Sequence, residues 1–552
     1  MRGRQGQLGN PPTDAAPRQA ALRAAAEGPA AAPITGLVMN SAGRLLIVGE
    51  AGVSLGWAEK LHDKLDTTVL IDAVGDDPQA PASERYARLS GKALSLDGHL
   101  GAFRLRWRRD DSLPEAEDGF DLVLDLSEPP LLRALELPDG YQAPGREPLA
   151  QALAVIELLP LIGEFEKPQY VALNPQLCAH SRAKLPGCDN CLSVCAADAI
   201  LAAGDAVRVD PYLCRGCGAC ATVCPSGALS YQYPRVADLG ARLRAMLLAY
   251  AEAGGEDACL LFHSATAGRQ LLARLQGGAG LPPRVLPVET WSAEAVGLDL
   301  MLAALALGAN QVAVLAAGCH DTAPLRRQVH SGEQILAGLG YGGEHLRIID
   351  AQDEQALVVS LAAWAPAVGV GRAASFCPHS DKRATLDLAI AHLREQAENP
   401  PQLIALAAGA PFGSVAASEA CTLCMGCVGA CPAGALVGGS DAPRLSFIEH
   451  NCLQCGLCVA SCPEQALSLT PRLLLEGARR ERLLRQAEIF RCTRCGKPMG
   501  ARPLIEAMVS RLAGHSMFAT EAARARLSMC GDCRVVDLVR NEDSVQASEM
   551  AP

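Results

Sequence analysis

The spacing of the cysteines constrains this chain more than any other feature of its sequence. Sixteen of the 23 cysteines stand in four runs, and three runs repeat the pattern C-x2-C-x2-C-x3-C-P. The complete runs are Cys214, Cys217, Cys220, Cys224; Cys421, Cys424, Cys427, Cys431; and Cys452, Cys455, Cys458, Cys462. Three thiolates on one tight loop can hold three irons of a cubane cluster, so the fourth ligand has to come from another run.

The remaining run is stretched. Nine residues separate Cys178 from Cys188, after which Cys191 and Cys195 follow at the usual spacing, and Ala196 replaces the proline. If Cys178 is not a ligand, the cluster of this run would be a three-iron form or labile.

The four runs resemble the bacterial-type dicluster 4Fe-4S ferredoxins, over about a sixth of the chain. In that family the last cysteine of each run binds the cluster of the partner run. The resemblance implies four 4Fe-4S clusters in two modules, with the following ligand sets. The first module would use Cys178, Cys188, Cys191, Cys224 for one cluster and Cys195, Cys214, Cys217, Cys220 for the other; the second would use Cys421, Cys424, Cys427, Cys462 and then Cys431, Cys452, Cys455, Cys458.

An internal repeat supports this pairing, because similar segments follow the last cysteines: CAADAI, CPSGAL, CPAGAL and CPEQAL. We expect a short helix beside each cluster. Gly216, Gly218, Gly426 and Gly456 lie inside the loops, where a residue without Cβ permits positive φ. Zinc and disulfides are the alternatives, but structural zinc needs two C-x2-C pairs, and disulfide-rich chains are usually small and secreted.

Composition limits the class of protein. With 552 residues, 49% hydrophobic, the chain is long enough for three or four domains with buried cores. A net charge of -11 and the lack of a basic run argue against nucleic acid as a partner. Cluster-binding thiolates need a reducing compartment, and the N-terminus has no apolar signal region, so we expect a cytoplasmic protein. Residues 300–319 carry no charge, but Gly308, Ala309 and Asn310 interrupt them, which predicts helix, turn and buried strand instead of a membrane span.

The predicted fold class is multidomain α/β, with two ferredoxin-like α+β modules inserted among Rossmann-like α/β domains. Residues 1–38 are rich in Ala, Pro and Gly and are expected to be disordered. The other predicted units are listed from the N-terminus: an α/β domain at 43–165, the first module at 170–234, a doubly wound α/β domain at 235–400, the second module at 415–472 and a helical metal-binding tail at 475–540.

The first α/β domain opens with a β-α-β pattern, and FRLRWRR and DLVLDLS are expected to continue its sheet. Gly49, Gly52 and Gly56 line its first turn, and Asp72 ends the second strand where a ribose-binding acid would stand. The spacing G-x2-G-x3-G is not the dinucleotide fingerprint, so a domain without nucleotide is favoured. A flavin or NAD in either α/β domain has no motif that supports it.

The middle domain alternates helices and strands, which predicts a parallel sheet. Its segment GLDLMLAALALGANQVAVLAAGCHD resembles the delta subunit of methyl-viologen-reducing hydrogenase, which implies electron transfer through a 2Fe-2S cluster. Such a cluster needs four thiolates and only Cys259, Cys319 and Cys377 are present, so we expect that the cluster has been lost. Gly369, Gly371 and Ala374 form a G-x-G-x-x-A pattern without a following helix, and we expect a loop.

Two C-x2-C pairs stand near the C-terminus, at Cys492 and Cys495 and at Cys530 and Cys533. Four thiolates in two pairs are typical of a closed zinc site, and RPLIEAMVSRLAG and TEAARARL predict helices between them. A fifth iron–sulfur cluster or a rubredoxin-like iron is the alternative.

These features together predict a polyferredoxin, an electron-transfer protein without a substrate site of its own. By analogy its partner would be a larger redox enzyme, such as a formate dehydrogenase or a hydrogenase. Two other classes stay open: a flavin- or nicotinamide-linked oxidoreductase subunit, and an iron–sulfur assembly or scaffold factor for a metalloenzyme.

Overall fold

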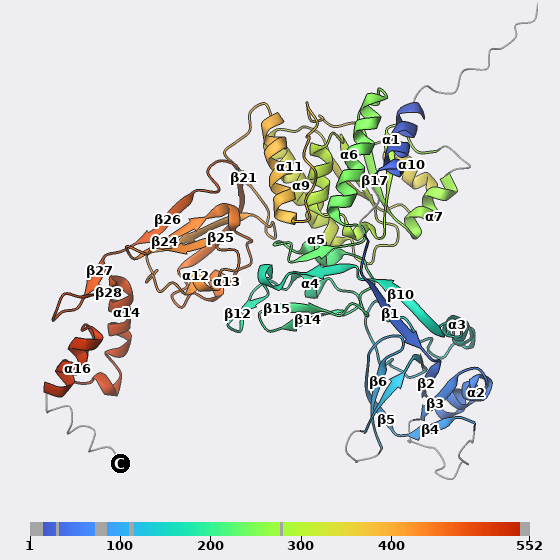
Figure 1. Ribbon diagram of the computed structural model, residues 1–552, viewed down its shortest axis with the longest axis horizontal. Helices are drawn as coiled ribbons and strands as arrows, with labels where there is room; N and C mark the ends of the chain where they lie inside the picture. Colours follow the sequence, from blue (N-terminus) through green and yellow to red (C-terminus); the bar gives the residue numbers. More distant parts are fainter. Residues whose placement is uncertain (1–14, 29–32, 72–84, 110–114, 276–279, 541–552) are drawn as a thin grey trace, which may run out of the picture.

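The computed structural model describes residues 15–28, 33–71, 85–109, 115–275 and 280–540. Figure 1 shows an extended arrangement in which the first ferredoxin module lies beneath the middle α/β domain. The first α/β domain lies to one side of that module, while the second module and the C-terminal tail lie to the other. Asp72, the candidate ribose-binding acid, falls outside the described residues.

The first α/β domain is built on a parallel sheet of five strands in the order β4-β3-β2-β8-β9. The strands are β2 Arg44–Gly49, β3 Asp66–Ile71, β4 Ala87–Ser90, β8 Leu122–Asp125 and β9 Tyr141–Gln142. Helices α2 Ala51–Leu61 and α3 Pro148–Leu158 cover one face, where their apolar side chains pack on alternate strand residues. The predicted β-α-β opening is confirmed by β2, α2 and β3.

A second sheet covers the other face of this domain. It is antiparallel and contains β5 Lys92–Asp97, β6 Phe103–Arg108 and β7 Glu115–Phe120. The expectation that FRLRWRR continues the parallel sheet is therefore wrong. Its side chains alternate, with Phe103, Leu105 and Trp107 buried and Arg104 and Arg106 exposed. That alternation is typical of an antiparallel strand with one solvated face, whereas central parallel strands are buried on both faces.

The expectation of disorder over residues 1–38 is wrong for its described part. Helix α1 Ala15–Glu27 packs on helix α6 Val236–Glu252 of the middle domain, and Ala21 is fully buried there. Arg18 donates to the carbonyl oxygen of Leu281 over 2.9 Å. Alanine buries little area per residue, so this helix has no broad apolar stripe that sequence reasoning could detect. Strand β1 Gly36–Ser41 then pairs with β10 Gly163–Pro168, so the first α/β domain begins before residue 43.

Both ferredoxin modules combine two antiparallel strand pairs with two short helices. In module 1, β11 Val171–Leu173 pairs with β16 Leu229–Tyr231, and β14 Ile200–Ala203 pairs with β15 Ala206–Val209. In module 2 the same pairs are β22 Gly413–Ala417 with β25 Leu467–Leu474, and β23 Leu436–Gly438 with β24 Arg444–Ile448. The helices are α4 Asn190–Ser193 and α5 Ala219–Val223 in module 1, and α12 Gly426–Ala430 and α13 Leu457–Ala460 in module 2.

Module 2 extends beyond the residues predicted for it, 415–472. Strand β21 Leu403–Ala405 joins β25, and β26 Glu481–Gln486 joins β24. The predicted boundary at 475 is therefore wrong, because the first residues of the expected tail complete the sheets of module 2. The tail itself begins with the hairpin of β27 Ile489–Arg491 and β28 Pro498–Ala501. Helices α14 Arg502–Leu512 and α15 Glu521–Leu527 follow between the two cysteine pairs, where helices were expected, and α16 Gly531–Arg540 begins directly after Cys530.

The middle domain contains a parallel sheet in the order β18-β17-β19-β20. Its elements in chain order are α6, β17 Cys259–Ser264, α7 Ala267–Arg274, β18 Val285–Thr290, α8 Leu298–Ala306, β19 Gln311–Leu315, α9 Ala323–Leu339, β20 Leu346–Ile349, α10 Glu354–Ala362 and α11 Lys382–Gln396. Helices cover both faces of the sheet. One face packs against α1, α6, α8, α9 and α11, and the other packs against α7 and α10. The parallel sheet with helices on both faces was predicted and is confirmed.

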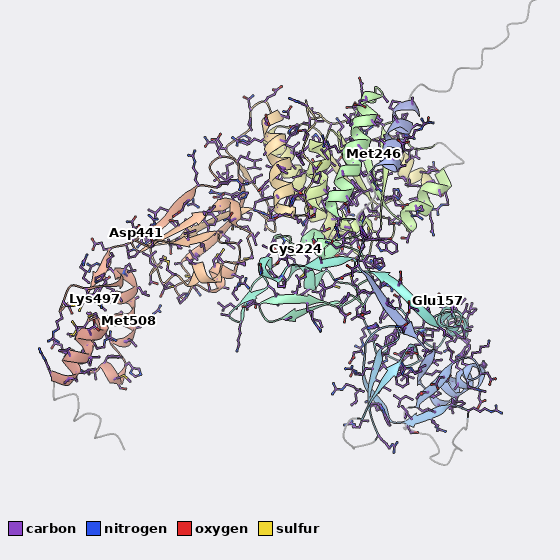
Figure 2. The ribbon with its side chains drawn as sticks, viewed as in Figure 1. Glu157, Cys224, Met246, Asp441, Lys497 and Met508 are labelled. Carbon is purple, nitrogen blue, oxygen red and sulfur yellow. The ribbon has the colours of Figure 1, made fainter. Side chains whose placement is uncertain are left out.

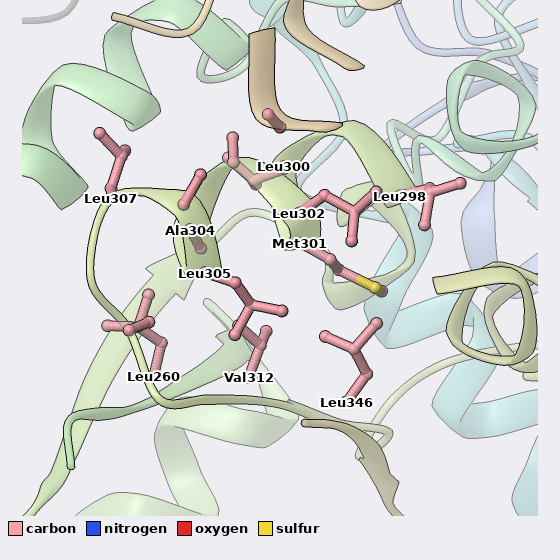
Figure 3. Close-up of a cluster of buried hydrophobic side chains, with 14 of the residues drawn as sticks. Leu260, Leu298, Leu300, Met301, Leu302, Ala304, Leu305, Leu307, Val312 and Leu346 are labelled. Atoms are coloured by element: carbon pink, nitrogen blue, oxygen red, sulfur yellow. The ribbon is translucent and has the colours of Figure 1, made fainter. Parts of the chain in front are cut away.

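Figure 3 shows how the apolar segment from residue 298 is buried in this domain. Leu298, Met301 and Leu305 of α8 face Leu260, Val312 and Leu346 of the sheet. Residues 300–319 therefore form helix, turn and strand as expected. Within the described ranges, no helix has both the length and the apolar character needed to cross a membrane. Residues 369–374 lie in an irregular segment, as their pattern predicted.

Candidate metal centres

The cysteine loops owe their shape to two left-handed residues in each complete run. These residues stand two and four positions after the first cysteine: Gly216 and Gly218, Leu423 and Met425, and Gln454 and Gly456, all with φ between 55° and 82°. The alternation turns the loop tightly, so that its side chains converge on one side. The expectation for Gly426 is wrong, because the left-handed residues of that loop are Leu423 and Met425, and Gly426 begins α12.

The thiols gather into the four sets that the family resemblance implies. We name them group A (Cys195, Cys214, Cys217, Cys220), group B (Cys178, Cys188, Cys191, Cys224), group C (Cys431, Cys452, Cys455, Cys458) and group D (Cys421, Cys424, Cys427, Cys462). In each group one buried cysteine has electrostatic contact with the other three. Burial, together with the neighbouring thiols, raises the pKa of Cys191 and Cys458 to about 12. A metal that binds these groups must displace their protons.

A hairpin explains how the stretched run keeps its first cysteine in place. Strands β12 Ser181–Arg182 and β13 Leu185–Pro186 pair across a turn at Ala183 and Lys184. The chain thereby returns, and the amide of Cys188 donates to the carbonyl oxygen of Ala179 over 2.8 Å. Cys178 and Cys188 are brought together in spite of the nine residues between them. The insertion extends outward as a hairpin and leaves Cys178 beside the other thiols of group B.

The repeat after each last cysteine has a hydrogen-bonding role. The amides of Ala199, Ala435 and Ala466 donate to the sulfur atoms of Cys195, Cys431 and Cys462, each over 3.3 Å. In the remaining run the amide of Leu229 donates to Cys224 over 3.5 Å, because the hydroxyl of Ser226 accepts the amide of Ala228. Hydrogen bonds to sulfur stabilise a thiolate and are one means by which a protein sets the potential of a cluster.

The surroundings of group A fit an iron–sulfur cluster. Its four cysteines line one cavity together with Ile200, Val209 and the two loop glycines Gly216 and Gly218. The walls are mostly apolar, and the donor set consists of sulfur alone, as 4Fe-4S clusters require. Tyr231 is buried behind the loop and donates to the carbonyl oxygen of Gly216 over 2.6 Å.

The two modules meet through groups B and C. Leu457 of module 2 is fully buried against Gly187, where a Cβ would lie 2.7 Å from its Cγ. Burial raises the pKa of Cys188 to about 11, and the thiol of Cys455 in the other module contributes to this increase. Cys188, Cys224 and Cys455 also line one common cavity. Figure 2 shows Cys224 at the centre of the molecule, between the middle domain and module 2.

The C-terminal cysteines form a separate and tighter group. The sulfur atoms of Cys492, Cys495, Cys530 and Cys533 all lie within 4.8 Å of one another, and those of Cys495 and Cys530 are 3.7 Å apart. A tetrahedron with metal–sulfur bonds of about 2.3 Å has edges of about 3.8 Å, so the group fits a single metal ion. The amide of Cys530 donates to Cys492 and lowers the pKa of that thiol to about 6.

This group joins the β27–β28 hairpin to the start of α16. Cys492 and Cys495 lie in the hairpin turn, and Cys530 and Cys533 lie at the first turn of the helix. Lys497, labelled in Figure 2, pairs with Asp532 over 3.1 Å beside the group. The expected helical tail is corrected in one respect: two of the four cysteines lie in the turn of a β-hairpin.

The three cysteines of the middle domain do not form a ligand set. Cys259 begins β17 at the amino edge of the sheet, whereas Cys319 follows β19 at the carboxyl edge. The two cysteines therefore stand at opposite edges of the sheet. Cys377 is exposed and accepts a hydrogen bond from Arg244 over 3.5 Å.

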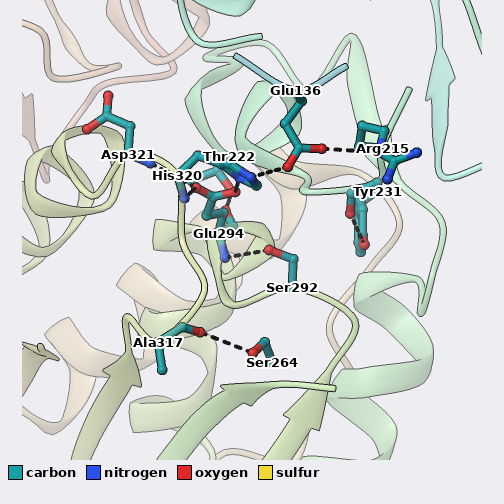
Figure 4. A network of polar contacts seen from close by, with 11 residues as sticks. Glu136, Arg215, Thr222, Tyr231, Ser264, Ser292, Glu294, Ala317, His320 and Asp321 are labelled. Atoms are coloured by element: carbon teal, nitrogen blue, oxygen red, sulfur yellow. Dashed lines mark hydrogen bonds and ion pairs between the residues drawn. The ribbon is translucent and has the colours of Figure 1, made fainter. Parts of the chain in front are cut away.

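Sequence reasoning assigned no role to His320, which lies in a polar network between three domains (Figure 4). Its imidazole pairs with Glu136 of the first domain, and its backbone amide donates to the buried Glu294 over 2.9 Å. Glu136 also pairs with Arg215 of the group A loop over 3.1 Å. These residues carry no motif, because the contacts join segments far apart in sequence.

Comparison with known families agrees with the cysteine geometry. Residues 207–230 match the 4Fe-4S binding domain, and residues 420–467 match the 4Fe-4S dicluster domain. No curated protein matches the chain. The two matched segments belong to the dicluster ferredoxin family, so the chain contains ferredoxin-type iron–sulfur domains. The stretched run at Cys178–Cys195 lies outside both matches, and its assignment depends on its geometry.

Proposed function

We propose that this chain is an iron–sulfur electron carrier in which four 4Fe-4S clusters form one path. Groups A, B, C and D would each hold one cluster, which accepts and releases single electrons. The observation that carries the proposal is the proximity of groups B and C, since Leu457 packs against Gly187 and Cys188 and Cys455 line one cavity. It joins two modules that are separated by about 200 residues of sequence.

The other junctions of the path lie within the modules. Cys220 of group A has electrostatic contact with Cys191 of group B, and Cys458 of group C has the same kind of contact with Cys427 of group D. The order of the groups is therefore A, B, C, D. Cys424 of group D is exposed. This end of the path would exchange electrons with a partner protein.

Helix α11 of the middle domain fixes the positions of the two modules relative to each other. Its first residue, Lys382, donates to the carbonyl oxygens of Ala221 and Thr222 in module 1 over 2.9 and 2.6 Å. Its second residue, Arg383, donates to the carbonyl oxygens of Pro411 and His450 beside module 2 over 2.9 and 2.8 Å. The middle domain would therefore serve as a rigid support for the path, without a redox centre of its own.

We further propose that the C-terminal group holds zinc, because four thiolates in a closed tetrahedron favour a structural ion. The physiological partner would be a larger cytoplasmic redox enzyme, of which a formate dehydrogenase or a hydrogenase is an example by analogy.

Anaerobic reconstitution tests the cluster content. The chain should bind about sixteen irons and sixteen acid-labile sulfides, since each of four cubanes contains four of each. In the reduced protein, magnetic coupling between neighbouring clusters should broaden their EPR signals. The double variant Cys455→Ser with Cys458→Ser removes group C and should abolish the coupling between the two modules. A plateau near eight irons, or the same EPR spectrum in this variant, would contradict a continuous path.

A further inference from the structure

A cavity of about 640 Å³ lies where the first α/β domain, module 1 and the middle domain meet. In the middle domain it is lined by Ser264 and Thr266 after β17 and by Gly318 and His320 after β19. These are the carboxyl ends of adjacent strands whose crossovers lead to opposite faces of the sheet, the usual ligand-binding position of an open α/β sheet. The volume is within the range of small-molecule sites.

This cavity shares a wall with the cavity of group A. Four residues line both spaces: Glu136, Arg215, Cys217 and His320. A molecule in the larger cavity would therefore be separated from the cluster site by a single layer of side chains. Electron tunnelling falls off exponentially with distance, so such a thin wall favours a redox-active occupant.

The cavity offers aromatic surfaces to a planar ring. The rings of Trp291 and Tyr170 have centroids 5.6 Å apart, and Tyr233 packs edge-on against both. Trp291 is more than one-third exposed, so part of its ring surface is available to a ligand. Tyr170 also touches the group A loop, because a Cβ on Gly216 would lie 2.6 Å from its ring. Met39, Leu161 and Phe165 add apolar surface.

The charges of the lining disfavour an anionic ligand. Its lysine and arginine are Lys167 and Arg215, its carboxylates are Glu136, Asp139 and Glu166, and its histidine, His320, pairs with Glu136. Both cations already have partners, since Arg215 pairs with Glu136 and Asp139, and the buried Lys167 donates to the carbonyl oxygen of Tyr212 over 2.7 Å. A phosphate would have to compete with these carboxylates for the cations, whereas a neutral ring with a carbonyl group could accept a hydrogen bond from the hydroxyl of Thr266.

We propose that this cavity binds a neutral quinone that exchanges electrons with group A. The inference rests on the proposed electron path. One quinone takes two electrons, one at a time from the reduced clusters, and two protons from water, which gives one hydroquinone and leaves two clusters oxidised. The path would then have a small-molecule site at its group A end and a protein partner at its group D end.

Binding is measured first, on the oxidised and cluster-loaded chain. Menadione, a short naphthoquinone, should bind saturably in equilibrium dialysis and quench tryptophan fluorescence. Trp291→Leu removes one aromatic wall, and Thr266→Trp fills the cavity; each should weaken binding at least tenfold without loss of iron. The matched control is Val359→Trp on α10, an exposed position that does not line the cavity, which should bind as the parent does.

Electron transfer is measured second, by mixing the reduced chain with menadione. The two cavity variants should need at least tenfold more quinone for half-maximal reoxidation, while ferricyanide oxidises every variant at the parent rate. Saturable binding without reoxidation would show that the cavity binds the quinone, but it would refute electron transfer from group A to that quinone. No saturable binding, or binding unaffected by both variants, would overturn the quinone site. Tighter binding of FMN than of riboflavin or menadione would overturn it in favour of a flavin nucleotide.

Discussion

Replacing Arg383 by methionine should loosen module 2 from the rest of the protein. The guanidinium donates two hydrogen bonds, of 2.9 and 2.8 Å, to carbonyl oxygens of Pro411 and His450, and it lies over the ring of Phe412. A hydrogen bond from a charged donor contributes about 1.5 to 3 kcal/mol, so the loss of two should cost about 3 kcal/mol. Methionine keeps part of the apolar contact but donates nothing.

Hydrogen–deuterium exchange in β25 measures this loss, because this central strand of module 2 pairs with both β21 and β22. If module 2 opens as a unit, its amides should exchange about 150-fold faster in Arg383→Met, which corresponds to about 3 kcal/mol. The matched control is Arg479→Met, which removes an exposed ion pair to Asp387 on the same helix. An exposed pair contributes less than about 1 kcal/mol, so β25 should exchange at most about fivefold faster. Equal exchange in the two variants would refute the clamping role of Arg383.

Three further predictions concern the cysteines. Cys178→Ala should convert one cubane to a three-iron cluster with its own EPR signal in the oxidised protein, since the hairpin brings Cys178 into group B; an unchanged spectrum and iron count would exclude it as a ligand. Cys492→Ser with Cys495→Ser should release about one zinc and make residues 488–540 sensitive to protease at unchanged visible absorbance, whereas loss of visible colour would indicate iron. Replacing Cys259, Cys319 and Cys377 by alanine should leave electron transfer to the native partner within about twofold, under ~0.5 kcal/mol on the barrier; a larger loss would make the middle domain a redox site.

The sequence was most informative where covalent spacing decides the structure. The C-x2-C-x2-C spacing predicted that three thiols of each run come together, because a loop of fixed length can place its cysteines in few ways. The family resemblance implied which cysteine of the partner run joins them. The strands of the middle domain were predicted for a similar reason, since fully buried parallel strands such as β17 and β19 are continuous apolar runs. The sequence alone could not predict that Cys178 lies beside the other thiols of group B. That position depends on a hairpin with two left-handed turn residues, Ala183 and Lys184, and neither is a residue type that favours this conformation.

Contacts between distant segments were not predictable from sequence. Helix α1 has no broad apolar face, yet it packs closely on α6 because small side chains allow the two helices to approach. Lys382 and Arg383 look like ordinary charged residues at a helix start, and only the fold shows that they hold two different modules. The cavity beside group A is likewise made by three domains, and each contributes residues with no local pattern.

The pairing of β1 with β10 makes the first α/β domain an insertion. The chain leaves the middle domain after α1, builds the whole domain and returns beside its point of departure, where Gly36 faces Pro168 and the amide of Gln169 donates to Thr35 over 3.0 Å. Residues 36–168 could therefore be replaced by a short turn without a break in the rest of the fold. Such a graft could have been gained or exchanged as one piece, because residues 36–168 contribute no cysteine to the four groups.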